Sequence, residues 1–195
     1  MRIIRSTEYR RMRWRNGAGE TAQIAQSPGD ASLDDFDWRI SMAEIGASGS
    51  FSVFPAIDRT LLILSGEGID LAIGGSPVLR LRKESDPCGF PGDAATTASL
   101  VGGPVRDFNV MTRRGRFAQR VERIVVQRPL RLDRPDNTRA IHVSDGSIEF
   151  PCAGEIRMLN TGDTLLYDRD TGDALEIGPP STAQIIVIDL EQVAR

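Results

Sequence analysis

The sequence predicts an all-β protein built from antiparallel sheets, with a short helical turn near the N-terminus. Most of the chain consists of short β-prone segments separated by Gly, Pro, Asp and Ser, among them residues 60–64, 107–112 and 184–188. Long apolar stripes with the 3.6-residue period of a helix are missing from the sequence. Many short strands and few helices favour a sandwich or barrel architecture.

A faint internal repeat predicts two similar barrels in tandem. The segment LSGEGIDL at residues 64–71 resembles VSDGSIEF at residues 143–150, and each is typical of a strand, a tight turn and a strand. Gly92-Asp93 and Gly162-Asp163 then precede a further strand in each half. This order of elements is typical of a cupin-type jelly roll. We expect a bicupin: an N-terminal cupin-like barrel, residues 1–126, carrying the ligand pocket, and a smaller, mainly structural barrel, residues 127–195.

The N-terminal segment contains the one helix that the sequence predicts. Ser6 or Thr7 is a suitable N-cap for one or two helical turns that extend to Met12. Residues 27–35 are polar and contain Pro, Gly and Asp, which predicts a loop.

Composition and charge exclude several classes of partner. The hydrophobic content of 40% and charged content of 26% are ordinary for a soluble globular protein, and no apolar run is long enough to cross a bilayer. The first residues lack the apolar stretch of a secretion signal, which predicts a cytoplasmic protein with no membrane partner. Arginines crowd residues 2–15, but Lys83 is the single lysine among 24 basic residues, so arginine is preferred everywhere. With a net charge of −3, nucleic acid is not an expected partner.

The residues that usually hold metals or nucleotides are sparse. Cys88 and Cys152 lie far apart, each beside a proline, and are interpreted as small structural side chains. His142 is the only histidine and lies on a strand-like segment, which favours a buried core role. Metal-dependent cupins need two or three histidines, so we expect no metal and no cofactor. Residues 17–22 match the dinucleotide fingerprint, but a preceding apolar strand and a following helix are missing.

Two tryptophan-containing strings and two later segments are candidates for a pocket. The strings are WRNGAGET at residues 14–21 and WRIS at residues 38–41. Indole, amide, hydroxyl and guanidinium groups suit a small planar anion. Arg59, at the start of an apolar strand, is either an anion clamp or half of a structural ion pair. Asp107, Asn109 and Met111 alternate on one strand face, which points either into the barrel or to solvent.

Several separated motifs together resemble the HutD/Ves family. They are Trp14-x-Asn16-Gly17-x-Gly19-x-Thr21, Trp38-Arg39-x-Ser41, the segment from Phe51 to Arg59, Phe90-Pro91-Gly92-Asp93, and Asp107 to Met111. Ala18 stands where many relatives would have glycine, and the second half of the chain matches more loosely. The resemblance implies a bicupin fold and a role in histidine utilisation, in which the protein senses an acidic intermediate such as N-formylglutamate or urocanate and moderates expression of the pathway.

The first hypothesis is a binding protein for a small carboxylate, with no catalytic residue. Arg59 or Arg39 neutralises the ligand, Trp38 and Phe54 form an apolar wall, and Trp14 braces the turn below. The expected ligand-binding residues are Asn16, Thr21, Trp38, Arg39, Ser41, Phe54, Arg59, Asp107, Asn109 and Met111. The alternative is a cofactor-free isomerase or hydrolase in which Asp107 is the general base. The sequence also allows a homodimer, with the second barrel as the packing partner.

Overall fold

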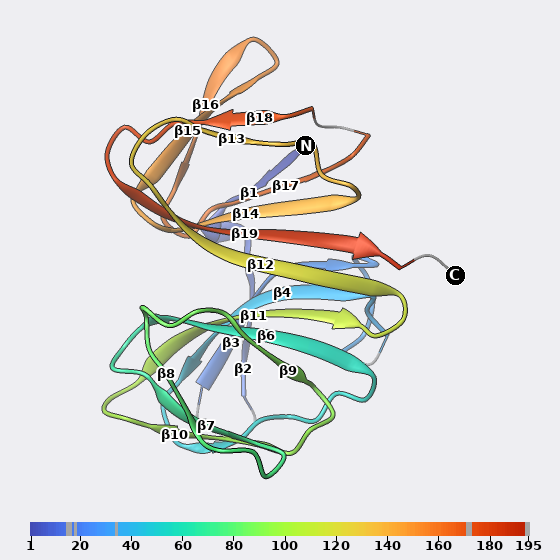
Figure 1. Ribbon diagram of the computed structural model, residues 1–195, viewed down its shortest axis with the longest axis vertical. Helices are drawn as coiled ribbons and strands as arrows, with labels where there is room; N and C mark the ends of the chain where they lie inside the picture. The colour runs from blue at the N-terminus through green and yellow to red at the C-terminus, as the bar shows by residue number, and fades with distance from the viewer. Residues whose placement is uncertain (15–16, 18, 34, 171–172, 194–195) are drawn as a thin grey trace. The chain divides into compact units, whose positions relative to one another are not determined.

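The computed structural model describes residues 1–14, 17, 19–33, 35–170 and 173–193, which form two compact units (Figure 1). The N-terminal unit comprises Arg10–Ala118 with Val193–Arg195, and the C-terminal unit comprises Met1–Tyr9 and Gln119–Gln192. The expected division at residue 126 differs from these units in two ways. The first nine residues belong to the C-terminal unit, and the change of unit falls inside a strand, β12 (Phe117–Val126).

The all-β prediction is confirmed, whereas the predicted helix is shorter than expected. In the described chain the one helix is a 3-10 turn, η1 (Ser6–Glu8), and no helix is long and apolar enough to cross a membrane. Arg5 is its N-cap, and the Glu8 carboxylate accepts a hydrogen bond from the Arg5 backbone N–H at 2.6 Å. Neither Ser6 nor Thr7 is the N-cap, because both lie inside the turn. Tyr9 is already extended.

The N-terminal unit contains a six-stranded and a four-stranded antiparallel sheet. The six-stranded sheet has the order β2-β3-β4-β11-β6-β9. Its strands are β2 (Arg10–Arg13), β3 (Gly19–Ser27), β4 (Trp38–Ile45), β11 (Val105–Arg113), β6 (Ile57–Ser65) and β9 (Cys88–Pro91). The other sheet has the order β5-β10-β7-β8. Its strands are β5 (Gly49–Ser50), β10 (Thr96–Leu100), β7 (Ile69–Ile73) and β8 (Leu79–Leu81).

The C-terminal unit contains a five-stranded sheet and two strand pairs. The five-stranded sheet has the order β1-β17-β14-β19-β12. Besides β12, its strands are β1 (Arg2–Ile4), β17 (Thr164–Asp168), β14 (Thr138–Asp145) and β19 (Ala183–Gln192). The pairs are β13 (Leu130–Leu132) with β18 (Leu175–Ile177), and β15 (Ser147–Cys152) with β16 (Glu155–Asn160). A bridge between Glu149 and Gly178 connects the two pairs.

The same order of eight strands recurs in the two units. The run β4-β11-β6-β9 corresponds to β12-β19-β14-β17, and β5-β10-β7-β8 corresponds to β13-β18-β15-β16. The expected repeat of the turns after β6 and β14 fits this correspondence. The Gly-Asp steps do not, because Gly92-Asp93 leads from β9 to β10 whereas Gly162-Asp163 leads from β16 to β17. No sheet of the described residues closes on itself, so closed barrels are not confirmed.

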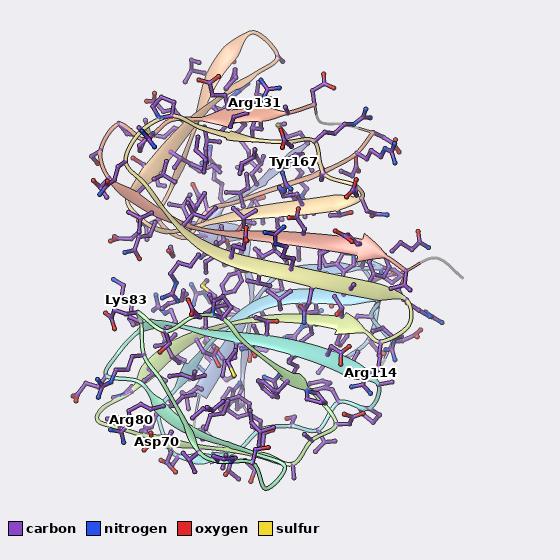
Figure 2. The ribbon with its side chains drawn as sticks, in the orientation of Figure 1. Asp70, Arg80, Lys83, Arg114, Arg131 and Tyr167 are labelled. Carbon is purple, nitrogen blue, oxygen red and sulfur yellow. The ribbon has the colours of Figure 1, made fainter. Side chains whose placement is uncertain are left out.

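The interiors of the two units differ. One cluster of aliphatic and aromatic side chains fills the C-terminal unit and includes Ile141, Val143, Ile185, Val187 and Tyr167. Of these residues, Figure 2 labels Tyr167. In the N-terminal unit, one cluster of apolar side chains lies around β6, β7 and β9 and another lies around Phe36. At several inward positions the N-terminal unit has polar side chains, whereas the corresponding positions of the C-terminal unit have apolar ones.

His142 lies in a buried hydrogen-bond network of the C-terminal unit. Its Nδ1 is 3.0 Å from the hydroxyl of Thr164, which is 2.9 Å from the hydroxyl of Tyr9. Burial lowers the pKa of His142 to about 3, although the charge of Asp163 opposes this. Asp163 fixes the N-terminal segment by accepting hydrogen bonds from Arg5 and the backbone of Ser6. The interpretation of His142 as a core residue agrees with this burial.

We expect His142 to stay neutral in the folded protein well below its ordinary pKa. Because it is the only histidine, its imidazole proton resonances in the NMR spectrum should not move between pH 8 and pH 5, whereas in urea they should titrate near pH 6.5. The folded pKa lies below the unfolded one, so this residue favours unfolding as the pH falls below 6.5. Titration near pH 6.5 in the folded protein would contradict the burial of a neutral ring.

Candidate ligand-binding site

A cavity of about 390 Å³ lies within the N-terminal unit. Strands β3, β4, β6 and β11 and the segment that follows β5 supply its walls. The lining residues are Trp14, Thr21, Arg39, Ser41, Ala43, Ile45, Ser50, Phe51, Ser52, Phe54, Arg59, Asp107, Asn109 and Met111. Its apolar walls come from both of these clusters.

Strand register gathers the polar side chains of this cavity. Alternate residues of a strand point to the same face, so β4 and β11 each direct several polar residues inward. Met111 pairs with Arg39 on one side and with Arg59 on the other, so the two arginines flank it in one row across three strands. In the next row Asn109 pairs with Ser41. The question of which way the Asp107 face points is settled: it points into the unit.

Arg59 is a deeply buried cation at the cavity, with 6% of its surface exposed. Its guanidinium carbon lies 4.8, 5.9 and 5.2 Å from the ring centroids of Phe51, Phe54 and Phe90. Its Nη2 donates a hydrogen bond to Asn109 Oδ1 at 2.6 Å. Within the described chain its Nε has no partner and it forms no ion pair with a carboxylate. Burial lowers the pKa of Arg59 to about 10, and the charge of Asp107 opposes this.

Asp107 and Asn109 extend this interaction into a chain of hydrogen bonds. Asp107 Oδ1 accepts from Asn109 Nδ2 and from the backbone N–H of Ala43, each at 2.9 Å. Its second oxygen, Oδ2, has no hydrogen-bond partner among the described residues. Burial raises the pKa of Asp107 to about 6, although Arg59, Asn109 and the Ala43 N–H all stabilise its charge. The carboxylate is therefore mostly ionised at pH 7.

The remaining polar contacts position the rim of the cavity. Arg39 Nε donates to Gln23 Oε1 at 3.3 Å, and burial lowers the pKa of Arg39. Trp14 Nε1 donates to Thr21 Oγ1 at 2.8 Å, which fixes the indole at the wall. Gly19 has no room for a side chain, because a Cβ there would lie 2.2 Å from the backbone oxygen of Glu44.

Eight of the ten expected ligand-binding residues line the cavity. They are Thr21, Arg39, Ser41, Phe54, Arg59, Asp107, Asn109 and Met111. Asn16 lies outside the described residues. Trp38 is buried but does not line the cavity, because it precedes Arg39 on β4 and adjacent strand residues point to opposite faces. Trp14, expected below the turn, forms the apolar wall instead.

Sequence reasoning missed six of the lining residues. They are Trp14, Ala43, Ile45, Ser50, Phe51 and Ser52. Extending the alternation from Arg39 and Ser41 along β4 would have identified Ala43 and Ile45. Trp14 was expected only as a brace for the turn. Ser50, Phe51 and Ser52 lie at or after β5, which is only two residues long and whose register follows from pairing with β10.

The C-terminal unit contains an arginine at the position that corresponds to Arg59. Arg59 pairs with Met111 on β11 and with Phe90 on β9, and Arg139 pairs with Asp189 on β19 and with Tyr167 on β17. Arg139 Nε donates to Asp189 Oδ1 at 2.5 Å. A carboxylate of the chain thus neutralises this second arginine.

The other polar positions of the cavity have aliphatic counterparts in the C-terminal unit. Asp107 pairs with Ile63 and corresponds to Ile185, which pairs with Val143. Asn109 corresponds in the same way to Val187. Because the repeated fold is built with aliphatic residues at these positions, the strand framework does not require the polar pair.

The raised pKa of Asp107 predicts a pH-dependent cost of folding. The folded state holds this proton between about pH 4 and pH 6, where the unfolded chain has lost it, so stability falls as the pH rises through this range. Asp107→Asn removes the effect. We expect the free energy of unfolding of the variant, minus that of the wild type, to increase by about 2 kcal/mol from pH 4 to pH 7 in urea titrations.

Asp70→Asn is the matched control for this measurement. Asp70 is half-buried and forms a two-pronged pair with Arg80, beside it in Figure 2, which lowers the pKa of Asp70. Its variant should therefore show no increase over the same range. A flat difference curve for Asp107→Asn would contradict a buried, titrating carboxylate.

Comparison with known proteins places the chain in a family. The family model for HutD matches residues 6–185. An uncharacterised 21.2 kDa protein in the hutC 3′ region of Pseudomonas putida is 36% identical over 122 residues, which are 63% of each chain. Protein Ves of Cronobacter sakazakii is 39% identical over 109 residues, 55% of this chain and 58% of Ves. These matches span less than two thirds of either relative.

Solved structures agree over nearly the whole chain. HutD from Pseudomonas fluorescens SBW25, in a structure described as the formate condition, is 28% identical with a TM-score of 0.84 over 99% of both chains. A cupin 2 conserved barrel protein from Leptotrichia buccalis is 8% identical, with a TM-score of 0.62 over 93% of this chain and 96% of its own, and shows that the fold is cupin-like. The chain belongs to the HutD family.

Proposed function

We propose that this protein binds a small carboxylate in the cavity of the N-terminal unit, with Arg59 as the cation that pairs with it. The observation that carries the proposal is the buried Arg59 guanidinium, which has no carboxylate partner in the described chain. At the corresponding position Arg139 is paired with Asp189. A ligand carboxylate would supply the charge that Asp189 supplies there, through charge-assisted hydrogen bonds.

The family suggests which carboxylates to test. A relative in Pseudomonas putida is named for its place beside hutC. The solved HutD structure is described as the formate condition, and formate is the simplest carboxylate. We infer an acidic intermediate of histidine degradation, such as N-formylglutamate or urocanate, as the ligand. Sensing it without a metal would allow the protein to moderate expression of the pathway.

The repeated strand order supports a division of labour between the units. We infer that the two sets of eight strands are two cupin-type domains, of which one retains a polar interior. The filled apolar core of the C-terminal unit supports a mainly structural role for that unit.

Loss of the Arg59 guanidinium should abolish most of the affinity. In calorimetric titrations with formate, N-formylglutamate and urocanate, we expect Arg59→Ala to weaken binding by roughly tenfold to a hundredfold, because one charge-assisted contact contributes about 1.5 to 3 kcal/mol. Arg80→Ala, which removes an exposed arginine that pairs with Asp70, should bind like the wild type. Equal affinity of Arg59→Ala and wild type would refute the role of Arg59.

A second variant tests the same prediction with Arg59 intact. Met111→Asp places a carboxylate where the C-terminal unit has Asp189, between the two arginines of the row. We expect this internal carboxylate to compete with the ligand and to abolish binding, whereas Met111→Asn, of similar size and without charge, should retain it. Unaffected binding by Met111→Asp would show that the ligand does not need these arginines.

Catalysis is the second candidate function, and Asp107 favours it. This carboxylate is fully buried beside the cavity, has a pKa raised to about 6, and leaves one oxygen without a partner. A general base near neutral pH needs these properties, and Arg59 could stabilise negative charge that develops on a substrate.

Turnover distinguishes catalysis from binding. If Asp107 is a general base, mass spectrometry of an acid incubated with the protein should detect a product, and Asp107→Asn should reduce its rate by at least about a hundredfold. Recovery of every bound acid unchanged after long incubation would leave binding as the function.

A further inference from the structure

We propose that Asp107 selects ligands that carry an N–H donor on the carbon that also bears the carboxylate, as in an acylated amino acid. This inference rests on the proposed function, because it assumes that Arg59 binds the carboxylate. It adds a second point of recognition on the same ligand.

Asp107 has hydrogen-bonding capacity at the cavity that the described chain does not use. Asp107 is 2% exposed, and Oδ1 accepts both of its hydrogen bonds. Oδ2 has no partner in the described chain, and Asp107 lines the cavity. An ionised carboxylate can only accept hydrogen bonds, so the group that satisfies Oδ2 must be a donor.

The position of Arg59 relative to Asp107 sets how far apart the carboxylate and the N–H donor of a ligand can be. One side-chain amide, that of Asn109, bridges Arg59 and Asp107: its oxygen accepts from Arg59 and its nitrogen donates to Asp107. Both ends of the Asn109 amide are thereby occupied, which fixes the orientation of the two charged groups. A ligand that spans them needs its carboxylate and its N–H close together.

The strand framework does not require a carboxylate at the position of Asp107. Ile185 occupies the corresponding position in the C-terminal unit, where the same strands form without a carboxylate. Burying a carboxylate near the arginines also weakens the attraction of a simple anion. A site that needed only to bind anions would bind them better without Asp107, so we assign to this residue the recognition of a donor.

The test compares two acids that differ in one group. N-acetylglycine has an amide N–H, and acetoxyacetate replaces it with an ester oxygen. We expect the wild type to bind the amide at least about tenfold more tightly, because the ester oxygen faces Oδ2 without a proton between them. N-acetylsarcosine, whose nitrogen is methylated, should bind as weakly as the ester. These comparisons need no variant.

Asp107→Asn should remove this preference. The variant's Oδ1 can keep the hydrogen bonds from Ala43 and Asn109, and its amide N–H₂ then replaces Oδ2 at the cavity. We expect acetoxyacetate to bind more tightly than to the wild type, because a negative charge is gone, and the amide to lose its advantage. Asp70→Asn, at a half-buried carboxylate that does not line the cavity, should keep the wild-type preference.

The outcomes separate this proposal from the one on which it rests. Equal binding of amide and ester by the wild type, or an unchanged preference in Asp107→Asn, overturns the role of Asp107 and leaves carboxylate binding intact. Both proposals fail if the wild type binds none of the three acetyl compounds and also does not bind formate, N-formylglutamate or urocanate.

Discussion

The buried charge of Arg59 is the constraint on which the rest of the N-terminal unit depends. A guanidinium removed from water is costly unless other groups replace its hydration. Three phenylalanine rings and the Asn109 oxygen do so in part, and Asn109 in turn is held by Asp107. These requirements explain why polar residues lie in the interior of the unit beside its apolar clusters.

The two units show two solutions to one arrangement of strands. With the same order of eight strands, one interior is filled by aliphatic side chains and an internal Arg139–Asp189 pair, and the other is left open. The difference lies in a few inward positions, such as Met111 for Asp189 and Asp107 for Ile185. A repeated fold can thus keep one copy for packing and free the other for recognition.

The sequence predicted the fold class and most of the cavity, because strand alternation and turn residues are local signals. It could not show that Tyr9 and the residues before it join the C-terminal unit, since that depends on pairing between β1 and β17, far apart in the chain. Trp38 was misplaced although Arg39 was not: residue type was weighed above the rule that neighbours on a strand face opposite ways. The two Gly-Asp steps were wrongly predicted to be equivalent, because the same dipeptide lies in different connections of the two units.

Polar groups whose hydrogen bonds are incomplete lower the stability of the folded protein, and a ligand that completes these hydrogen bonds raises it. Interactions that the chain leaves unmade at Arg59 and Asp107 are made only on binding, so a ligand that pairs with both stabilises the folded state by mass action. An internal carboxylate paired with Arg59, as Asp189 is paired with Arg139 in the other unit, would stabilise the fold and neutralise the Arg59 guanidinium. That the chain contains both arrangements supports the proposal that the polar cavity binds a ligand.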